Sequence, residues 1–200
     1  MRSAFPAPQG LYHPDNERDA CGVAFVAQLS GERSHAVVRQ ALTALENLEH
    51  RGASGAEPDS GDGAGILVQI PDEFFRAVLA EQGVTLPPRR AYAAGIAFLP
   101  DDDEAEAAAI KTIEAVAAEE HLEVVAWRDL PFDPDGVGAT ARSVMPRLRQ
   151  LFVKSSTNTL GLALERQVFA LRKRAEHEAD VYFPSLSIRT IVYKGMLTTA

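Results

Sequence analysis

Short apolar runs alternate with amphipathic, helix-like segments along most of the chain, and this alternation limits the possible folds more than any other feature. The runs typical of strands are 22–29, 66–70, 92–99, 122–127 and 186–193. The segments with a helical spacing of apolar residues are 35–50, 72–82, 103–121 and 163–179. Because helices and strands must both cover their apolar faces, the mixture predicts layered packing of helices on sheets.

Local signals refine this pattern at a few places. Ser34 is a suitable N-cap for the first helix. Pro146 leaves the segment 141–153 ambiguous, because proline disrupts both a regular helix and a central strand. The polar stretch 155–159, "SSTNT", predicts a turn, and the acidic run 101–104 predicts a solvated helix start.

Length and charge exclude several classes of protein. The chain has 200 residues, which is typical of one domain, and a formal net charge of −8, which argues against a nucleic-acid partner. No apolar run approaches the roughly 20 residues of a membrane span. Residues 1–20 lack the apolar core of a secretory signal, so we interpret them as an irregular leader.

The chain contains one cysteine, Cys21. A single cysteine forms no internal disulfide, which favours a reduced, cytoplasmic protein. It also excludes a cysteine-ligated zinc or iron–sulfur site within this segment, and the histidines show no metal-ligand spacing. No metal site is therefore expected here.

Cys21 lies where the leader ends and the first strand-like run begins, within "DNERDACGVAF". The simpler interpretation is a small buried side chain, since free cysteine is often buried. If the chain were cut before Cys21, however, the thiol and a new α-amine would share one residue. An α-amine with a pKa near 8 could accept the proton of a thiol whose pKa is about 8.5, giving a thiolate nucleophile without a histidine.

Two glycine-containing stretches follow the first helix. In "HRGASGAE", 50–57, His50, Arg51 and Gly52 are explained by a helix C-terminus. In "SGDGAG", 60–65, the glycines indicate either a tight turn or a close backbone approach to a ligand, and taken alone a turn is the better interpretation. The second stretch matches neither a dinucleotide fingerprint nor a P-loop.

The combination of motifs is more specific than any one of them. The segments "ERDACGVAFVA" (17–27), "HAVVRQALTALENLEHRGASGAEPDSGDGAGILVQIP" (35–71), "LERQVFALRKRAE" (164–176) and "SIRTIVYKGML" (187–197) together resemble the N-terminus of the large subunit of bacterial glutamate synthase. The resemblance runs from about residue 10 to residue 200. It implies a class II glutamine amidotransferase domain of the α+β class, with an N-terminal-nucleophile hydrolase fold built as a layered α/β/β/α sandwich.

The resemblance also implies a processing step and a reaction. Residues 1–20 would be a propeptide removed between Ala20 and Cys21, and residues 21–200 would be the N-terminal part of the amidotransferase domain. Cys21 would attack the side-chain amide of L-glutamine, with its own α-amine as general base, and release glutamate and ammonia. The full enzyme would pass the ammonia to 2-oxoglutarate for reductive glutamate formation.

The other site residues carried over from the family are Arg51 with Gly52, and Asp62 with Gly63. Arg51 matches an arginine of the family pocket, with a structural and orienting role. Asp62 and Gly63 match a motif near the nucleophile, and no chemical step is assigned to them. This sequence departs from the family at Ala24 and Ile188, and both changes are expected to be tolerated.

The family's glutamine-binding motif, its oxyanion-hole Asn-Gly pair and the aspartate for the substrate amine follow the "YKGM" strand, beyond residue 200. The stretch 155–159 echoes the missing motif but precedes that strand, so it is expected to be unrelated. The fold is therefore expected to be incomplete at its C-terminal end and the 200-residue chain to be inactive alone. The alternatives are a non-catalytic fragment or binding module, or another class II glutamine amidotransferase.

No cofactor is expected within this segment. The resemblance implies FMN and an iron–sulfur cluster in the rest of a full-length enzyme, and a small FAD- and NADPH-binding subunit as a possible partner. Neither nucleic acid nor a membrane is expected as a partner.

Overall fold

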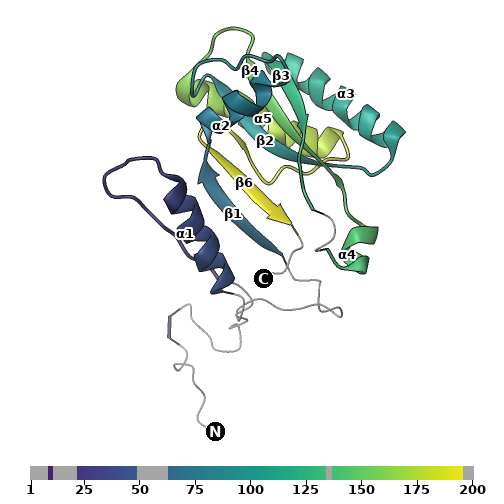
Figure 1. The fold of residues 1–200 in the computed structure, drawn as a ribbon. Coiled ribbons are helices and arrows are strands. Elements are labelled where there is room, and N and C mark those ends of the chain that lie inside the picture. Colours follow the sequence, from purple (N-terminus) through teal and green to yellow (C-terminus); the bar gives the residue numbers. More distant parts are fainter. Residues whose placement is uncertain (1–8, 11–21, 49–62, 134–136, 196–200) are drawn as a thin grey trace.

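The computed structural model describes residues 9–10, 22–48, 63–133 and 137–195 (Figure 1). Its helices are α1 (His35–Glu46), α2 (Asp72–Ala80), α3 (Asp103–Glu119), α4 (Ala139–Ser143) and α5 (Gly161–Glu178). Its strands are β1 (Ala64–Gln69), β2 (Tyr92–Leu99), β3 (Leu122–Asp129), β4 (Arg147–Ser155), β5 (Leu186–Ser187) and β6 (Thr190–Gly195).

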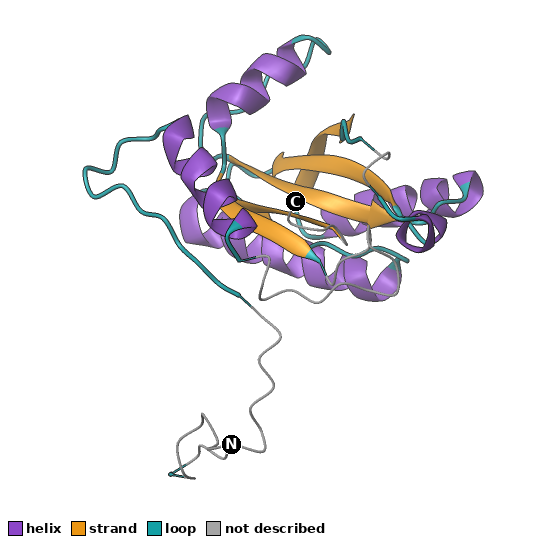
Figure 2. Ribbon diagram, turned by 60° about the horizontal axis from the view of Figure 1, so that its bottom comes forward, coloured by secondary structure: helices purple, strands orange, loops and turns teal. Residues whose placement is uncertain are grey.

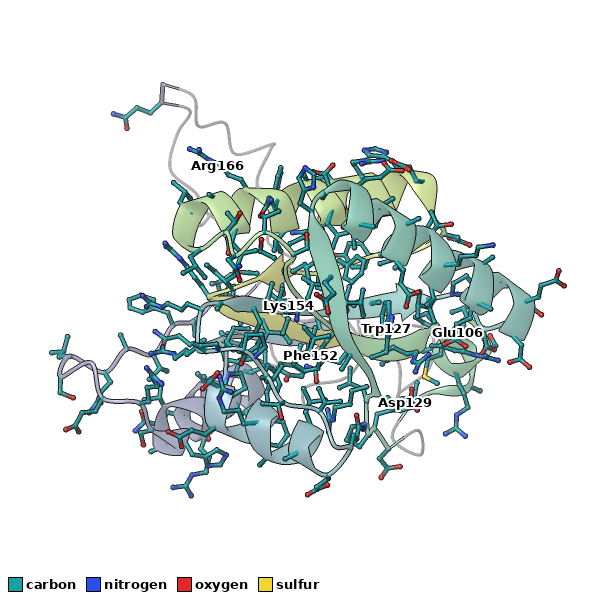
Figure 3. The ribbon with its side chains drawn as sticks, turned by 90° about the horizontal axis from the view of Figure 1, so that it is seen from above. Glu106, Trp127, Asp129, Phe152, Lys154 and Arg166 are labelled. Atoms are coloured by element: carbon teal, nitrogen blue, oxygen red, sulfur yellow. The ribbon has the colours of Figure 1, made fainter. Side chains whose placement is uncertain are left out.

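These strands form two antiparallel sheets. One sheet has four strands in the order β3-β4-β2-β5, and the other pairs β1 with β6. Helices cover both sides of the strands (Figure 2). Helices α3 and α5 lie on one side of the four-stranded sheet, and α1 and α2 lie on the other (Figure 3). The two-stranded sheet contacts β2 through β6, and α1 lies beside β1. The layers therefore run helix, sheet, sheet, helix, and the expected α+β, N-terminal-nucleophile hydrolase architecture is confirmed.

Two apolar cores hold these layers together. The first lies between the four-stranded sheet and helices α3 and α5, with Leu151, Leu164 and Phe183 fully buried. The second lies on the opposite face, between that sheet, α2 and the β1–β6 pair. Its centre is an edge-to-face contact between Phe75 of α2 and Phe152 of β4, whose ring centroids are 5.1 Å apart. Alternate residues of β4 thus enter opposite cores, as a strand covered on both faces requires.

The expected helix starts are confirmed. The Ser34 hydroxyl accepts a hydrogen bond from the Ala36 amide at 3.1 Å. Asp102 caps α3 in the same way, because its carboxylate accepts from the Ala105 amide at 2.8 Å. Both side chains satisfy amides that have no partner within the first helical turn.

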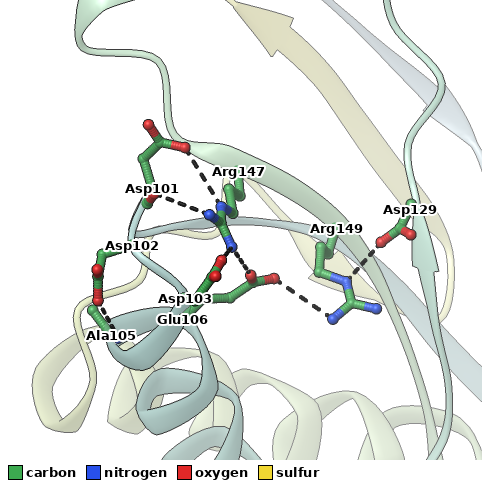
Figure 4. A network of polar contacts seen from close by, with 8 residues as sticks. All are labelled: Asp101, Asp102, Asp103, Ala105, Glu106, Asp129, Arg147 and Arg149. Carbon is green, nitrogen blue, oxygen red and sulfur yellow. Dashed lines mark hydrogen bonds and ion pairs between the residues drawn. The ribbon is translucent and has the colours of Figure 1, made fainter.

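The acidic start of α3 is more than a solvated end, because it pairs with the neighbouring strand. The Arg147 guanidinium on β4 lies 2.6 Å from both Asp103 and Glu106 and 3.4 Å from Asp101 (Figure 4). The neighbouring Arg149 lies 2.9 Å from Asp129 on β3. This network joins α3 to the first residues of β4 and to the end of β3.

Two predictions from the sequence are corrected. Residues 22–29 form no strand, and all of them are exposed except Val26, which is partly buried. The predicted strand 186–193 is two strands, because the chain leaves one sheet after Ser187 and joins the other at Thr190. The ambiguous segment 141–153 contains the end of α4 and most of β4, and Pro146 lies in the break between them.

Candidate functional site

The predicted site residues divide between the described and the undescribed parts of the chain. Cys21, Arg51, Gly52 and Asp62 lie outside the described residues, as does most of the proposed leader. Gly63 is the predicted site residue that the structure describes, and it lies immediately before β1.

The backbone at Gly63 explains why glycine is needed there. Its φ is +120°, a conformation that side-chain-bearing residues rarely adopt, and an added Cβ would lie 3.3 Å from the Gly195 carbonyl oxygen. Two residues later, a Cβ on Gly65 would lie 2.7 Å from the Lys194 Cβ and 2.8 Å from the Tyr193 carbonyl oxygen. These two glycines therefore allow the chain to enter β1 in close contact with β6.

The described end of the glycine-rich stretch 60–65 makes a close backbone approach, and that approach is to the neighbouring strand β6. The rest of the stretch, residues 60–62, lies outside the described residues. The pairing of β1 with β6 begins at Ala64 opposite Gly195 and ends at Gln69 opposite Thr190. The described end of the glycine-rich stretch and the end of β6 therefore lie side by side.

Two residues of β6 point into the second core. Ile191 is fully buried, and Tyr193 packs against the same cluster. Burial raises the pKa of the Tyr193 hydroxyl above its ordinary value. Strand β6, whose end lies beside Gly63, is thus anchored by side chains between the two sheets.

A cluster of hydrogen bonds forms at residues 185–190, where the chain crosses from one sheet to the other. We call this segment the crossover. The Ser187 hydroxyl donates to one carboxylate oxygen of Glu165 at 2.6 Å, and the Ile188 amide donates to the other oxygen at 2.9 Å. The same hydroxyl accepts from the amides of Arg189, at 3.0 Å, and Thr190, at 3.4 Å. Amides that would otherwise lack strand partners are satisfied by these two side chains.

Two further contacts complete this crossover. The Ser185 hydroxyl accepts from the Val192 amide at 2.8 Å. The Arg189 carbonyl accepts from the Ile70 amide, just beyond β1, at 2.9 Å. The crossover therefore holds the start of β6 and the end of β1 together.

The sequence analysis did not single out Glu165, Ser185 or Ser187. Glu165 lies within the helix segment that carried the family resemblance, and the two serines alternate with apolar residues in "SLS". Alternating serines in a buried strand are a signal that could have identified them, because buried hydroxyls need hydrogen-bond partners. A cleft of about 420 Å³ runs beside α5 and is lined partly by Glu165 and Ser187.

The stretch 155–159 forms the expected turn. The Ser155 hydroxyl accepts from the amides of Thr157 and Thr159 at 3.1 and 3.0 Å. The hydroxyls of Thr157 and Thr159 lie 3.0 Å apart. These polar groups bond to one another within the turn, which agrees with a local structural role for the stretch.

Within the residues that the structure describes, no group of three histidine, cysteine or acidic side chains is arranged to hold a metal ion. The one cysteine of the chain does not supply the thiolate set of an iron–sulfur cluster. Of the helices in the described part, none is long and apolar enough to cross a membrane.

Comparison with known proteins defines the class of protein. The family of class II glutamine amidotransferases matches residues 21–200. The chain therefore belongs to the class II glutamine amidotransferases, in agreement with its layered sheets. The match begins at Cys21.

The relatives compared here are glutamate synthases. The chain is 41% identical over 199 residues to the glutamate synthase [NADPH] large chain of Bacillus subtilis, which covers 96% of this chain and 13% of the relative. It is 42% identical over 189 residues to the chloroplastic ferredoxin-dependent glutamate synthase of Oryza sativa, covering 91% of this chain and 12% of the relative. It is 39% identical over 186 residues to the ferredoxin-dependent glutamate synthase 2 of Synechocystis, covering 90% of this chain and 12% of the relative. The chain thus spans about one eighth of the length of these relatives.

Proposed function

We propose that this chain is the start of the glutamine-hydrolysing domain of a glutamate synthase large chain, with Cys21 as the nucleophile. The observation that carries the proposal is the position of the family match, which begins at the single cysteine of the sequence. The identity to glutamate synthase large chains supports this assignment over other class II amidotransferases.

In the proposed reaction, removal of residues 1–20 frees the α-amine of Cys21. The amine accepts the thiol proton, and the thiolate attacks the side-chain carbonyl carbon of glutamine. The C–N bond breaks, the amine returns the proton to the leaving nitrogen, and ammonia departs. Water then attacks the thioester and releases glutamate together with the thiol.

The other residues have supporting roles in this proposal. Arg51 with Gly52, and Asp62 with Gly63, belong to the pocket around Cys21. The observed geometry supports this for Gly63, because its positive φ and its contact with Gly195 define how the chain enters β1. Both glycines of the described stretch are then needed for the shape of the site and not for a chemical step.

The longer protein supplies the rest of the reaction in this proposal. Ammonia would pass to 2-oxoglutarate, and FMN and an iron–sulfur cluster would be bound by the remainder of the polypeptide, in the cytoplasm. A small FAD- and NADPH-binding subunit would be a partner only of an NADPH-dependent enzyme.

The first experiment tests the N-terminal nucleophile. In the full-length polypeptide that contains this chain, intact mass should show loss of Met1–Ala20. Cys21→Ala should abolish glutaminase activity, and glutamine should slow alkylation of Cys21 by iodoacetamide.

A second variant separates the α-amine from the thiol. Ala20→Pro is expected to block the cut before Cys21 and leave a thiol with no free amine. Glutamine hydrolysis by a protein that retains Met1–Ala20 would contradict the proposed base. Retained, unreactive Cys21 in the wild-type protein would favour a non-catalytic module.

A further inference from the structure

The crossover between the two sheets is held by hydrogen bonds to a side chain from helix α5. After Ser187 the chain leaves the four-stranded sheet, and after two intervening residues it begins β6 at Thr190. Of the side chains that hold this crossover, Glu165 comes from α5, and the two serines come from the crossover segment itself. Glu165 therefore links the crossover to the helix layer.

Helix α5 is a rigid support for this contact. Its Leu164, Val168 and Leu171 are fully buried against the four-stranded sheet. Glu165 follows Leu164 directly, so its backbone is fixed by the first core. A carboxylate on such a support accepts two hydrogen bonds, one from a hydroxyl and one from an amide, and each is stronger than a bond between neutral groups.

Strand β6 carries the effect of this contact toward the candidate site. It pairs with β1 along its whole length, from Thr190 opposite Gln69 to Gly195 opposite Ala64. At its far end, a Cβ added to Gly63 would lie 3.3 Å from the Gly195 carbonyl oxygen, so the two segments approach closely there. A change in how β6 leaves the crossover would therefore change where the chain enters β1.

We propose that Glu165 is a positioning residue for glutamine hydrolysis, acting through Ser187 and β6 on the chain at Gly63. This inference rests on the proposed function, since it assigns Glu165 a role in the same site. Its carboxylate would hold the crossover so that β6 and β1 keep the chain at Gly63 in one geometry. Small displacements of a catalytic site are costly, because a shift of about 1 Å can lower the rate on the order of 100-fold.

Glu165→Gln tests this role with little change in side-chain size. Ser187 and Ile188 donate to different oxygens of the carboxylate. In Gln one of these oxygens becomes an NH2 group, which donates and cannot accept, so one of the two hydrogen bonds is lost in this geometry. Glu176→Gln is the matched control. Glu176 also lies on α5, also accepts from a backbone amide, that of Phe183 at 3.4 Å, and pairs with Arg172 at 3.2 Å. It lies eleven residues further along the same helix. Its partners Arg172, Lys173 and Phe183 all lie outside the crossover.

The experiment compares glutaminase kcat and KM in the full-length polypeptide, expressed per mole of Cys21 that reacts with iodoacetamide, together with thermal unfolding. We expect Glu165→Gln to lower kcat/KM roughly 10- to 100-fold with the reactive Cys21 still present. Ser187→Ala should reproduce this loss, and the double variant should add little to either single change. Glu176→Gln should lower the unfolding temperature with kcat/KM unchanged.

The outcomes separate the two proposals. If wild-type protein hydrolyses glutamine and Glu165→Gln differs from it only in unfolding temperature, the positioning role is overturned and the proposed function stands. If wild-type protein shows no glutaminase activity and no reactive Cys21, the proposed function itself fails.

Discussion

Two segments of similar composition differ completely in pairing and burial in this molecule. Residues 22–29, "GVAFVAQL", and β2, "YAAGIAFL", are each eight residues long and mostly apolar. Strand β2 lies between β4 and β5, and Tyr92, Ala93 and Ala94 are almost completely buried. In residues 22–29, the exposed fractions of Val23, Phe25 and Leu29 are 89%, 93% and 101%.

The difference in burial comes from the surrounding strands and cores and not from the amino acids of the two segments. Strand β2 has a hydrogen-bonding partner on each side and an apolar core on each face. Among the described residues, the segment 22–29 has neither. A strand is stable only when its backbone groups and its apolar face are both covered, so composition alone cannot create one.

The largest expected effect is at Phe152, which is fully buried in the second core beside β2. Phe152→Ala should lower the free energy of unfolding by about 3–5 kcal/mol, because it removes the edge-to-face contact with Phe75 and leaves a cavity. Urea unfolding measures this. A loss below about 1 kcal/mol would contradict close packing between the two sheets.

At the start of β2, Tyr92→Phe should cost about 1.5–3 kcal/mol, because the hydroxyl donates to the Asp72 carboxylate at 2.9 Å. Burial, followed by this hydrogen bond, raises the pKa of Tyr92 above its ordinary value. An unfolded tyrosine loses its proton near pH 10 while the native one keeps it. The stability from Tyr92 is therefore complete below about pH 10 and falls as the pH rises further.

Urea unfolding at a series of pH values checks the alkaline effect. The wild-type protein should lose stability above about pH 10 more steeply than Tyr92→Phe. A residual slope should persist in the variant, because burial also raises the pKa of Tyr193. Parallel pH profiles for the two proteins would show that Tyr92 is not protected in the native state.

Gly95, in the middle of β2, tests how closely β5 approaches. An added Cβ would lie 2.4 Å from the Ser185 carbonyl oxygen, so Gly95→Ala must displace backbone. We expect a loss of about 1–3 kcal/mol. Amide exchange should become faster at Leu186, which pairs with Gly95. Unchanged exchange there would contradict the pairing of β2 with β5.

The smallest effect is expected in the segment that resembles β2 but has no partner. Phe25→Ala should change the free energy of unfolding by less than about 0.5 kcal/mol, because its side chain is exposed. Phe152→Ala is the matched substitution in the other region. A loss at Phe25 as large as that at Phe152 would mean that residues 22–29 are buried in solution.

Much of the fold could be predicted from local chemistry. The spacing of apolar residues identified α2, α3, α5 and β2 close to their observed ends, and the hydroxyl of Ser34 marked the start of α1. The pattern failed between 186 and 193, because a short, largely apolar run does not show that a chain changes sheets. It also failed at 22–29, because the sequence does not show that this segment has no partner strand within the described part of the chain.

The candidate site divides in the same way. Cys21, Arg51, Gly52 and Asp62 came from the family resemblance and lie outside the described residues, so their roles stay predictions. Gly63 and Gly65 were visible as glycines in the sequence, but their purpose was not. Only the packing against β6 shows that the missing side chains make room for the neighbouring strand.

The sequence by itself determined the secondary structure of most segments, the layered class of the fold and the one cysteine available for chemistry. These properties depend on residue type and on spacing within short segments, and both can be read directly from a sequence. The tertiary structure decided which apolar segment is paired and which is exposed, and where the chain crosses between sheets. It also brought Glu165 to a strand more than twenty residues away. These contacts join residues distant in the sequence, and no local pattern encodes such distances.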